Sequence, residues 1–333
     1  MKKPNAWFRK PRRRLLGMIA VAALLVAAGE LGARLGLGLG DPPLSIAYPD
    51  LEYAFRSGTY RRFGNTVHIN SHHMRSPELS KSKTRYNEVR VMLMGDSVIN
   101  GGALTDQSQL ASELLSDRLA TDLNQPVVVG NISAGSWGPG NLLAYARRFG
   151  LFDADIVVIV VNSEDATDNP TDTAVVGIDP SFPDRRPVSA IGEAIERYVT
   201  PVIRSALRKP SPLTTTQQDN DAAIARGLAD LSDLCDLAAS AGAEVVILHF
   251  PNRGELRGPM FRGHDAIMRL AAAKTIPFID LKAAVVASLA AGVDPYRPHD
   301  NIHPNDVGQR LIFEALLPKL LHMLASDREA APR

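Results

Sequence analysis

The sequence contains a single cysteine, Cys235, so no disulfide bond can form within the chain. Cys235 lies in a segment with the periodicity of an amphipathic helix, where a small buried residue is expected rather than a reactive thiol. A metal site built from several cysteines is excluded. The lack of disulfides does not exclude export, because a chain of 333 residues can bury a large core without them.

The sequence also lacks a strong excess of charge, with 37 Lys and Arg against 36 Asp and Glu. Seven of the basic residues precede Glu30, the first acidic one, which leaves 30 basic against 36 acidic residues and a net charge of −6 for the rest. A protein body that binds nucleic acid needs a basic face, so this function is not expected. With 45% hydrophobic and 22% charged residues and no internal repeat, the chain is typical of folded proteins.

A long apolar segment follows the basic N-terminal run. Residues 15–28 contain no charged residue. A bilayer span needs roughly 20 apolar residues, and the segment reaches this length if it continues past Glu30 and Arg34. These two residues are four apart, so they can pair on one helical face while Arg34 extends toward the membrane interface. We therefore expect a basic cytoplasmic segment over residues 1–14 and a transmembrane signal anchor over residues 15–40.

The basic flank places this end of the chain in the cytoplasm and the body on the far side of the inner membrane, in the periplasm or outside the cell. A cleaved signal peptide is the alternative, because Val26-Ala27-Ala28 resembles a processing site. The apolar character continues beyond that point, which favours a retained single-pass anchor. Both interpretations predict export.

Residues 41–87 are expected to form an irregular linker and N-terminal extension, beginning at Asp41-Pro42-Pro43 and containing one short strand at residues 67–70. Residues 88–326 alternate between apolar strands and helices, which predicts an α/β domain with a parallel sheet of about five strands covered on both faces. The predicted strands are residues 89–94, 126–129, 156–161, 244–248 and 277–279. The predicted helices are residues 108–123, 142–149, 221–241, 265–274, 282–291 and 306–325. A long insertion before residue 221 contains a further helix near residues 191–207.

The residues that can take part in catalysis lie at the ends of the predicted strands and before the last predicted helix. In a sheet of this kind ligands bind beyond the carboxyl ends of the strands. The first strand leads into Ser97, and a loop before the last helix contains Asp300 and His303, three residues apart. A serine becomes nucleophilic when an imidazole accepts its proton, and an aspartate fixes the imidazole tautomer. These three residues therefore predict a serine hydrolase.

These motifs resemble those of the SGNH (GDSL) hydrolase family, over most of the chain after about Val89. Gly95-Asp96-Ser97 matches the first family block, and Asp300-x-x-His303-Pro304 matches the last. The resemblance implies a flavodoxin-like three-layer α/β/α sandwich, ester hydrolysis and no cofactor. It implies Ser97 as nucleophile, His303 as general base and acid, and Asp300 as the residue that orients His303.

The sequence departs from the family pattern at two oxyanion positions. The glycine whose N–H helps to hold the oxyanion falls on Ser136, just after Gly135. The usual asparagine of the third block falls on Glu164, and an ionised carboxylate only accepts hydrogen bonds. Asn162 is a possible substitute, and a protonated Glu164 is another. The expected oxyanion hole therefore includes Ser97 with these four residues, and loss of one donor costs about 100- to 1,000-fold in rate.

Several other polar and aromatic residues have both a functional and a structural interpretation. Trp137, beside the second block, is a candidate to bind substrate by stacking on a sugar ring, with core packing as the equal alternative. His249 is expected to be a structural histidine with satisfied hydrogen bonds. The acids at 164, 165 and 168 are expected to cap the following helix rather than bind a cation, so no metal is expected.

The resemblance, together with an anchor and an exported domain, suggests a serine esterase that removes or transfers acyl groups, with O-acetyl groups as the first choice, on cell-envelope or exported polysaccharide. Its partners would be an acylated carbohydrate or another ester and the membrane, and the sequence leaves the oligomeric state open. Two alternatives stand beside this. One is a weakly catalytic or non-catalytic SGNH-fold component of polysaccharide assembly, suggested by Glu164, and the other is a lipid esterase, suggested by the anchor.

Overall fold

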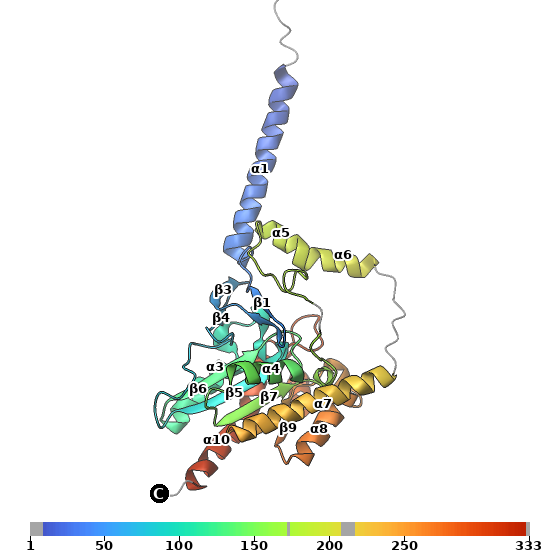
Figure 1. Ribbon diagram of the computed structural model, residues 1–333. Helices are drawn as coiled ribbons and strands as arrows, with labels where there is room; N and C mark the ends of the chain where they lie inside the picture. Colours follow the sequence, from blue (N-terminus) through green and yellow to red (C-terminus); the bar gives the residue numbers. More distant parts are fainter. Residues whose placement is uncertain (1–8, 172–173, 208–216, 331–333) are drawn as a thin grey trace, which may run out of the picture.

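The computed structural model describes residues 9–171, 174–207 and 217–330, and its centre is a five-stranded parallel sheet (Figure 1). The strand order is β6-β5-β7-β8-β9. The first strand of the sheet, β5, therefore lies inside it, with β6 added on one side and the later strands on the other. This order is that of the flavodoxin-like doubly wound fold, as predicted. The strands are β5 (Val89–Gly95), β6 (Val127–Ser133), β7 (Ile156–Val161), β8 (Glu244–His249) and β9 (Phe278–Asp280).

The alternation of side chains along the strands separates two hydrophobic cores. In β5, Met92 and Met94 pack into one core, whereas Val91 and Leu93 pack into the other. Every residue of β5 and β7 is buried, since helices cover both faces of the sheet. The five predicted strands are thus confirmed, with β6 ending four residues later than expected.

Six helices form the two outer layers. The core that contains Met92 is closed by α4, α7 and α8, and the other core is closed by α3, α9 and α10. The helices are α3 (Ala111–Leu123), α4 (Pro139–Phe149), α7 (Gln217–Ser240), α8 (Arg262–Ala273), α9 (Lys282–Ala290) and α10 (Asp306–Ala330). Each lies within a few residues of its predicted position.

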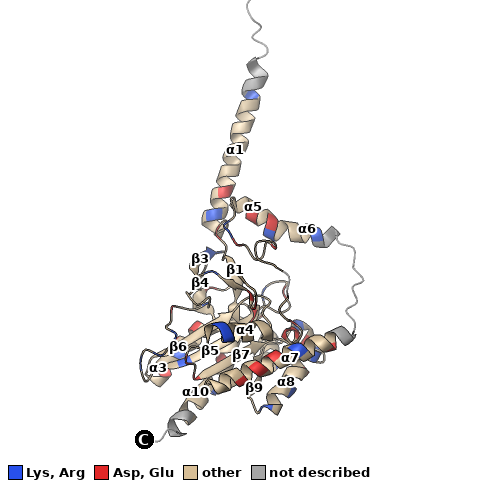
Figure 2. Cartoon of the chain, in the orientation of Figure 1, with Lys and Arg blue, Asp and Glu red and all other residues tan. Residues whose placement is uncertain are grey.

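The N-terminal helix α1 (Arg9–Leu37) projects from this body with its apolar side chains exposed (Figure 1). Its stretch from Arg14 to Leu37 is long and apolar enough to cross a membrane, and in Figure 2 it is charged only near its ends. Such a helix is consistent with a signal sequence or an anchor. Arg34 Nε donates to Glu30 Oε1 at 2.7 Å, which confirms the expected pair. Of the predicted basic segment, residues 1–8 lie outside the described residues.

Residues 41–87 are more ordered than the sequence suggested. They contain two antiparallel hairpins, β1 (Ser45–Tyr48) with β2 (Glu52–Phe55) and β3 (Gly58–Arg62) with β4 (Asn65–Ile69). The second turn is Phe63-Gly64, with both residues at positive φ, as the tight hairpin turn requires. The prediction of an irregular stretch with one strand is therefore wrong, because phenylalanine rarely marks such a turn.

The long insertion contains the predicted helix near residues 191–207, in three parts. They are α5 (Ala190–Ala194), a π-helical turn (Ile195–Val199) and α6 (Thr200–Leu207). The start of α5 is fixed to α1, because the Glu30 carboxylate accepts the N–H groups of Ala190 (2.8 Å) and Ile191 (3.0 Å). The insertion therefore lies beside the body-proximal end of α1.

Candidate active site

Ser97 lies on a sharp turn at the carboxyl end of β5. Gly95 ends the strand so close to its neighbour that a Cβ there would lie 2.5 Å from the carbonyl oxygen of Val160, so a side chain is not tolerated. Asp96 then caps the four-residue helix α2 (Ser97–Asn100), with Oδ1 accepting the N–H of Val98 at 2.9 Å. Asp96 thus orients the turn, as expected from the sequence, and Ser97 is the first residue of the helix.

His303 and Asp300 form one rigid local turn before α10. Asp300 Oδ1 accepts the N–H groups of Ile302 and His303, both at 2.9 Å, and Oδ2 lies 2.7 Å from His303 Nδ1. Burial alone would raise the pKa of Asp300, but these hydrogen bonds and the neighbouring imidazole hold that pKa below its usual value. Asp300 is therefore an ionised acceptor beside the ring.

The structure brings this turn to Ser97 across 206 residues of sequence. His303 Nε2 lies 2.9 Å from Ser97 Oγ. Because the Asp300 carboxylate accepts a proton from Nδ1, the neutral imidazole presents a lone pair at Nε2 toward the serine hydroxyl. The three side chains are thus arranged for proton transfer from Ser97 to His303.

Two arginines that the sequence did not single out hold the loops around Ser97. The buried Arg75 donates hydrogen bonds to carbonyl oxygens of the loop after α2, those of Asn100, Gly102 and Thr105. Burial and the nearby charge of Arg297 lower the pKa of Arg75 to about 9. Arg297 donates to the carbonyl of Gly101 at 2.5 Å, and its N–H donates to the carbonyl of His303 at 3.0 Å. Arg297 therefore ties the serine loop to the histidine loop.

The loop after β6 contains Gly135 and Ser136, whose backbone N–H groups are the expected oxyanion donors. Ser136 has φ of 58°, the left-handed conformation that favours glycine, which explains why the family pattern has glycine there. Tyr53 of the first hairpin donates its hydroxyl to the carbonyl of Gly135 at 2.7 Å and so fixes the loop. In the part of the chain that the structure describes, the N–H groups of Ser97, Gly135 and Ser136 have no hydrogen-bond acceptor.

The two side chains considered as a further oxyanion donor are both otherwise engaged. Asn162 Nδ2 donates to Asp96 Oδ2 at 3.1 Å and to Asp165 Oδ1 at 2.7 Å, so its amide protons are already taken. Glu164 is exposed and accepts a hydrogen bond from Asn252 Nδ2 at 3.2 Å. The expectation that Asn162 or Glu164 supplies a donor is therefore not met by this structure. The carboxylates of Asp96 and Asp165 hold the Asn162 amide, and the Glu164 carboxylate acts as an acceptor.

Carboxyl groups gather beside the serine turn. Burial raises the pKa of Asp96 to about 6, and burial, followed by the charges of Asp96, Glu52 and Glu164, raises the pKa of Asp168 to about 6. Burial and the charge of Asp96 also raise the pKa of Asp165. The Asp165 carboxylate accepts the backbone N–H of Asn162 at 2.9 Å and so caps the short helix at residues 163–166. Of the three acids expected to cap the following helix, Asp165 does so, whereas Glu164 accepts a hydrogen bond from Asn252. Together these carboxyls give the surroundings of Ser97 an acidic character.

Trp137 is a core residue and not a sugar platform. Its side chain is 1% exposed, its Nε1 donates to the carbonyl of Tyr53 at 3.1 Å, and its ring packs against those of Tyr53 and Tyr145. A ring without an exposed face cannot stack on a ligand, so the substrate-binding interpretation of Trp137 is wrong.

His249 is buried at the end of β8, as expected for a structural histidine, but its hydrogen bonds are only half satisfied. Nε2 lies 3.0 Å from Ser163 Oγ. Nδ1 has no hydrogen-bond partner in the described part of the chain, with a carboxylate oxygen of Asp280 at 3.5 Å. The expectation of a fully satisfied histidine is therefore wrong.

Comparison with solved structures gives distant likenesses to esterases and acylhydrolases. A lipase/acylhydrolase from Enterococcus faecalis is 18% identical, covering 70% of this chain and 95% of that one, with a TM-score of 0.44. The structure of TesA is 20% identical (70% and 99% covered, TM-score 0.44). A two-domain esterase active on acetylated mannans is 13% identical (71% and 50% covered, TM-score 0.45). A search of curated proteins finds no match.

The model of the GDSL-like lipase/acylhydrolase family matches residues 93–311, about two thirds of the chain. The matched region runs from β5, just before Ser97, into α10, just after His303. The chain therefore belongs to the GDSL-like lipase/acylhydrolase (SGNH) family and is an esterase or acylhydrolase of that family.

Proposed function

We propose that Ser97, His303 and Asp300 are the catalytic residues of a serine esterase. Ser97 Oγ attacks the ester carbonyl carbon while its proton passes to His303 Nε2, and Asp300 stabilises the imidazolium that forms. His303 then gives the proton to the departing alcohol, which leaves an acyl group on Ser97. A water molecule that loses its proton to His303 hydrolyses this intermediate. The 2.9 Å contact between Ser97 Oγ and His303 Nε2 carries the proposal.

The oxyanion of the tetrahedral intermediate is held by the backbone N–H groups of Ser97 and of Gly135 or Ser136. Their freedom from other acceptors among the described residues supports this role. An amide side chain as an additional donor is lacking, since Asn162 is held by Asp96 and Asp165. We expect a turnover about 100- to 1,000-fold below that of an enzyme with the complete set.

The proposed substrate is a neutral, acylated carbohydrate, with O-acetyl groups on a cell-envelope or exported polysaccharide as the first choice. Two features of the site support it. The side chains of His303 and Asp300 are 31% and 25% exposed, so the serine lies at a surface that a polymer can reach. The carboxyls of Asp96, Asp168 and Glu164 repel anionic head groups, which disfavours acidic phospholipids.

We further propose that α1 is a retained anchor in the inner membrane, with the catalytic body periplasmic or extracellular. The apolar helix runs without a break from Arg14 to Leu37, past the processing site at Ala28, and this continuity supports retention. N-terminal sequencing of the mature protein distinguishes the two cases: a new N-terminus after Ala28 indicates a cleaved signal peptide, and the original N-terminus on protein in the membrane fraction indicates an anchor.

The test uses the full chain purified in detergent and p-nitrophenyl acetate as substrate. We expect Ser97→Ala and His303→Ala to lower kcat by at least about 10⁴-fold. The matched controls are Ser240→Ala and His322→Ala, which change exposed residues on α7 and α10 and should leave kcat unchanged. A wild-type rate equal to that of Ser97→Ala would instead favour the non-catalytic alternative.

The same preparation separates the substrate classes. Release of acetate from an acetylated polysaccharide, with p-nitrophenyl acetate preferred to the butyrate and laurate esters, supports a deacetylase. Preference for laurate supports the lipid esterase. Appearance of the acetyl group on an added oligosaccharide, rather than as free acetate, identifies transfer.

A further inference from the structure

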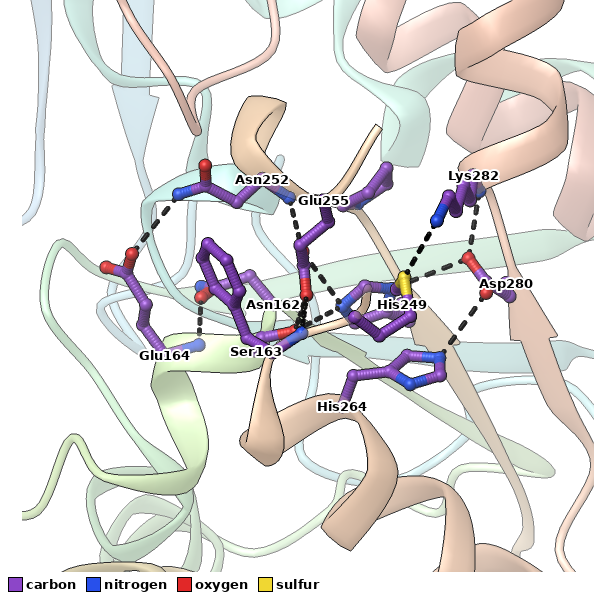
Figure 3. A network of polar contacts seen from close by, with 12 residues as sticks. Asn162, Ser163, Glu164, His249, Asn252, Glu255, His264, Asp280 and Lys282 are labelled. Carbon is purple, nitrogen blue, oxygen red and sulfur yellow. Dashed lines mark hydrogen bonds and ion pairs between the residues drawn. The ribbon is translucent and has the colours of Figure 1, made fainter. Parts of the chain in front are cut away.

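A second cluster of polar side chains lies at the carboxyl ends of β8 and β9 (Figure 3). It consists of His249 at the end of β8, Asp280 at the end of β9 and His264 in the first turn of α8. Both imidazoles are at least 94% buried, and the Asp280 side chain is 34% exposed. None of these three residues takes part in the mechanism proposed above.

The hydrogen bonds around His249 fix which of its nitrogens carries the proton. Ser163 Oγ donates its only proton to Glu255 Oε1 at 2.5 Å, so it can only accept from His249 Nε2, 3.0 Å away. Glu255 is held as an acceptor by the N–H groups of Asn252 and Phe261. The neutral ring therefore has its proton on Nε2 and a bare lone pair on Nδ1.

The same reasoning applies to His264. Its Nδ1 lies 3.0 Å from Asp265 Oδ1, and a carboxylate accepts, so the proton of the neutral ring is on Nδ1. The lone pair is then on Nε2, a buried atom without a hydrogen-bond partner among the described residues. Both histidines thus direct unprotonated nitrogens to one point.

That point is the carboxylate of Asp280. His249 Nδ1 lies 3.5 Å from Oδ1 and His264 Nε2 lies 3.3 Å from Oδ2, and the three donor atoms lie within 4.8 Å of one another. Three lone-pair donors facing each other repel unless a proton on one ring or a cation between them binds the lone pairs, and a cation can bind all three at once. We propose that His249, His264 and Asp280 bind a zinc ion.

The geometry suits zinc. A tetrahedral site with bonds of about 2.0–2.2 Å has ligand atoms roughly 3.3–3.6 Å apart. Each imidazole nitrogen lies at such a distance from one oxygen of Asp280, 3.5 Å from Oδ1 and 3.3 Å from Oδ2, and small side-chain shifts from the 4.8 Å limit would bring one oxygen to both. Two imidazoles and one carboxylate are ligands that zinc accepts, with a water molecule or another donor in fourth place. Ser163 and Asp265 hold the second ring nitrogens in the manner of metal-bound histidines.

One charge in the cluster opposes the cation. Lys282 Nζ donates to the carbonyl of Gly258 at 3.1 Å and to Met260 Sδ at 3.5 Å, and its backbone N–H donates to Asp280 Oδ1 at 2.8 Å. Figure 3 shows this side chain on the Asp280 side of the cluster. Replacement by glutamine removes the positive charge, so Lys282→Gln should bind zinc more tightly.

The ion would join three separate elements. It would tie the ends of β8 and β9 to α8. Ser163, which directly follows Asn162 beside the serine turn, contacts the cluster through His249. Because the ion would join these elements, we expect it to stabilise the folded chain. Zinc at 100-fold above its Kd should raise Tm by about 5 °C.

The test uses the full chain in detergent, stripped with a chelator and titrated with zinc against a chromophoric competitor. We expect one zinc ion per chain. His264→Asn and Asp280→Asn should weaken binding by more than about 100-fold, and Asp265→Ala by about 10- to 100-fold. His322→Asn, an exposed histidine on α10, is the control and should bind as the wild type does.

Cobalt provides a measurement that needs no variant. Co²⁺ added to the stripped wild-type chain should give the visible bands of a tetrahedral site, and zinc should abolish them. Absence of a stoichiometric ion in the wild type overturns the proposal, as does zinc binding unchanged in both His264→Asn and Asp280→Asn. Esterase activity without zinc leaves the assignment of Ser97 intact, so the two proposals fail separately.

Discussion

The proton on Nδ1 of His303 is held by Asp300, and the chemistry proposed for Ser97 depends on that proton staying there. Asp300→Asn should lower kcat on the order of 10⁴-fold, because an amide can donate to Nδ1 and so stabilises the tautomer whose Nε2 cannot accept the serine proton. Initial rates with p-nitrophenyl acetate measure this. Asp306→Asn, an exposed carboxylate three residues after His303, is the control. A variant that keeps more than a tenth of wild-type kcat would contradict the role of Asp300.

Asp168 allows a test of the acidic surroundings that leaves the proposed catalytic residues unchanged. Its pKa is raised to about 6, whereas an unfolded aspartate titrates near 3.8, so the folded chain binds a proton more tightly. Its contribution to the free energy of unfolding is complete below pH 4 and is lost as the pH rises through 6. Asp168→Asn should therefore raise Tm at pH 8 and leave it nearly unchanged at pH 4. A larger gain at pH 4 would contradict the assignment.

Individual residues differ in how far the sequence determined their place. Ser97, His303 and Asp300 could be singled out because each is in a short motif beside a recognisable strand or helix. The burial of Trp137 and the engagement of Asn162 could not, since their partners Tyr53 and Asp96 lie 84 and 66 residues away. Contacts of that separation have no local signal.

At the scale of elements, Tyr53 of the first hairpin holds the loop after β6, which carries the proposed oxyanion donors. Its hydroxyl donates to the carbonyl of Gly135, and a net hydrogen bond of this kind is worth about 1 kcal/mol. Tyr53→Phe should lower kcat about 5-fold with little change in KM, because the loop loses its anchor. Tyr60→Phe is a matched control, since it removes a tyrosine hydroxyl that donates to Arg56 in the neighbouring hairpin. Equal effects of the two changes would contradict a specific role of Tyr53.

The central sheet was predictable and the hairpins were not, for a physical reason. Strands such as β7, with six consecutive buried β-branched residues, can only lie inside a sheet covered on both faces. The hairpin strands are four or five residues long, alternate only partly and turn at Phe63-Gly64. Their order depends on packing against the domain, through contacts such as that of Tyr53 with Trp137.

At the scale of the whole molecule, the proposed placement of α1 in a membrane would bring the helical insertion to the membrane surface. Glu193 lies in a buried ion pair with Arg62, so that side of the insertion faces the body. Ile195, Val199 and Ile203, spaced four apart, are 46–52% exposed on another side. An apolar stripe beside a membrane helix is typical of a helix that lies in the bilayer interface.

This placement can be tested with one introduced thiol. Cys235 is buried and its pKa is raised to about 11, so it stays unlabelled at pH 7 while Val199→Cys takes an environment-sensitive fluorophore. In full-length protein reconstituted into liposomes, we expect blue-shifted emission that lipid-borne quenchers reduce. Glu196→Cys, on the side near Glu193, should report water in the same vesicles. Equal emission at both positions would mean that the stripe does not touch the bilayer, and the membrane would then hold this enzyme through α1 alone.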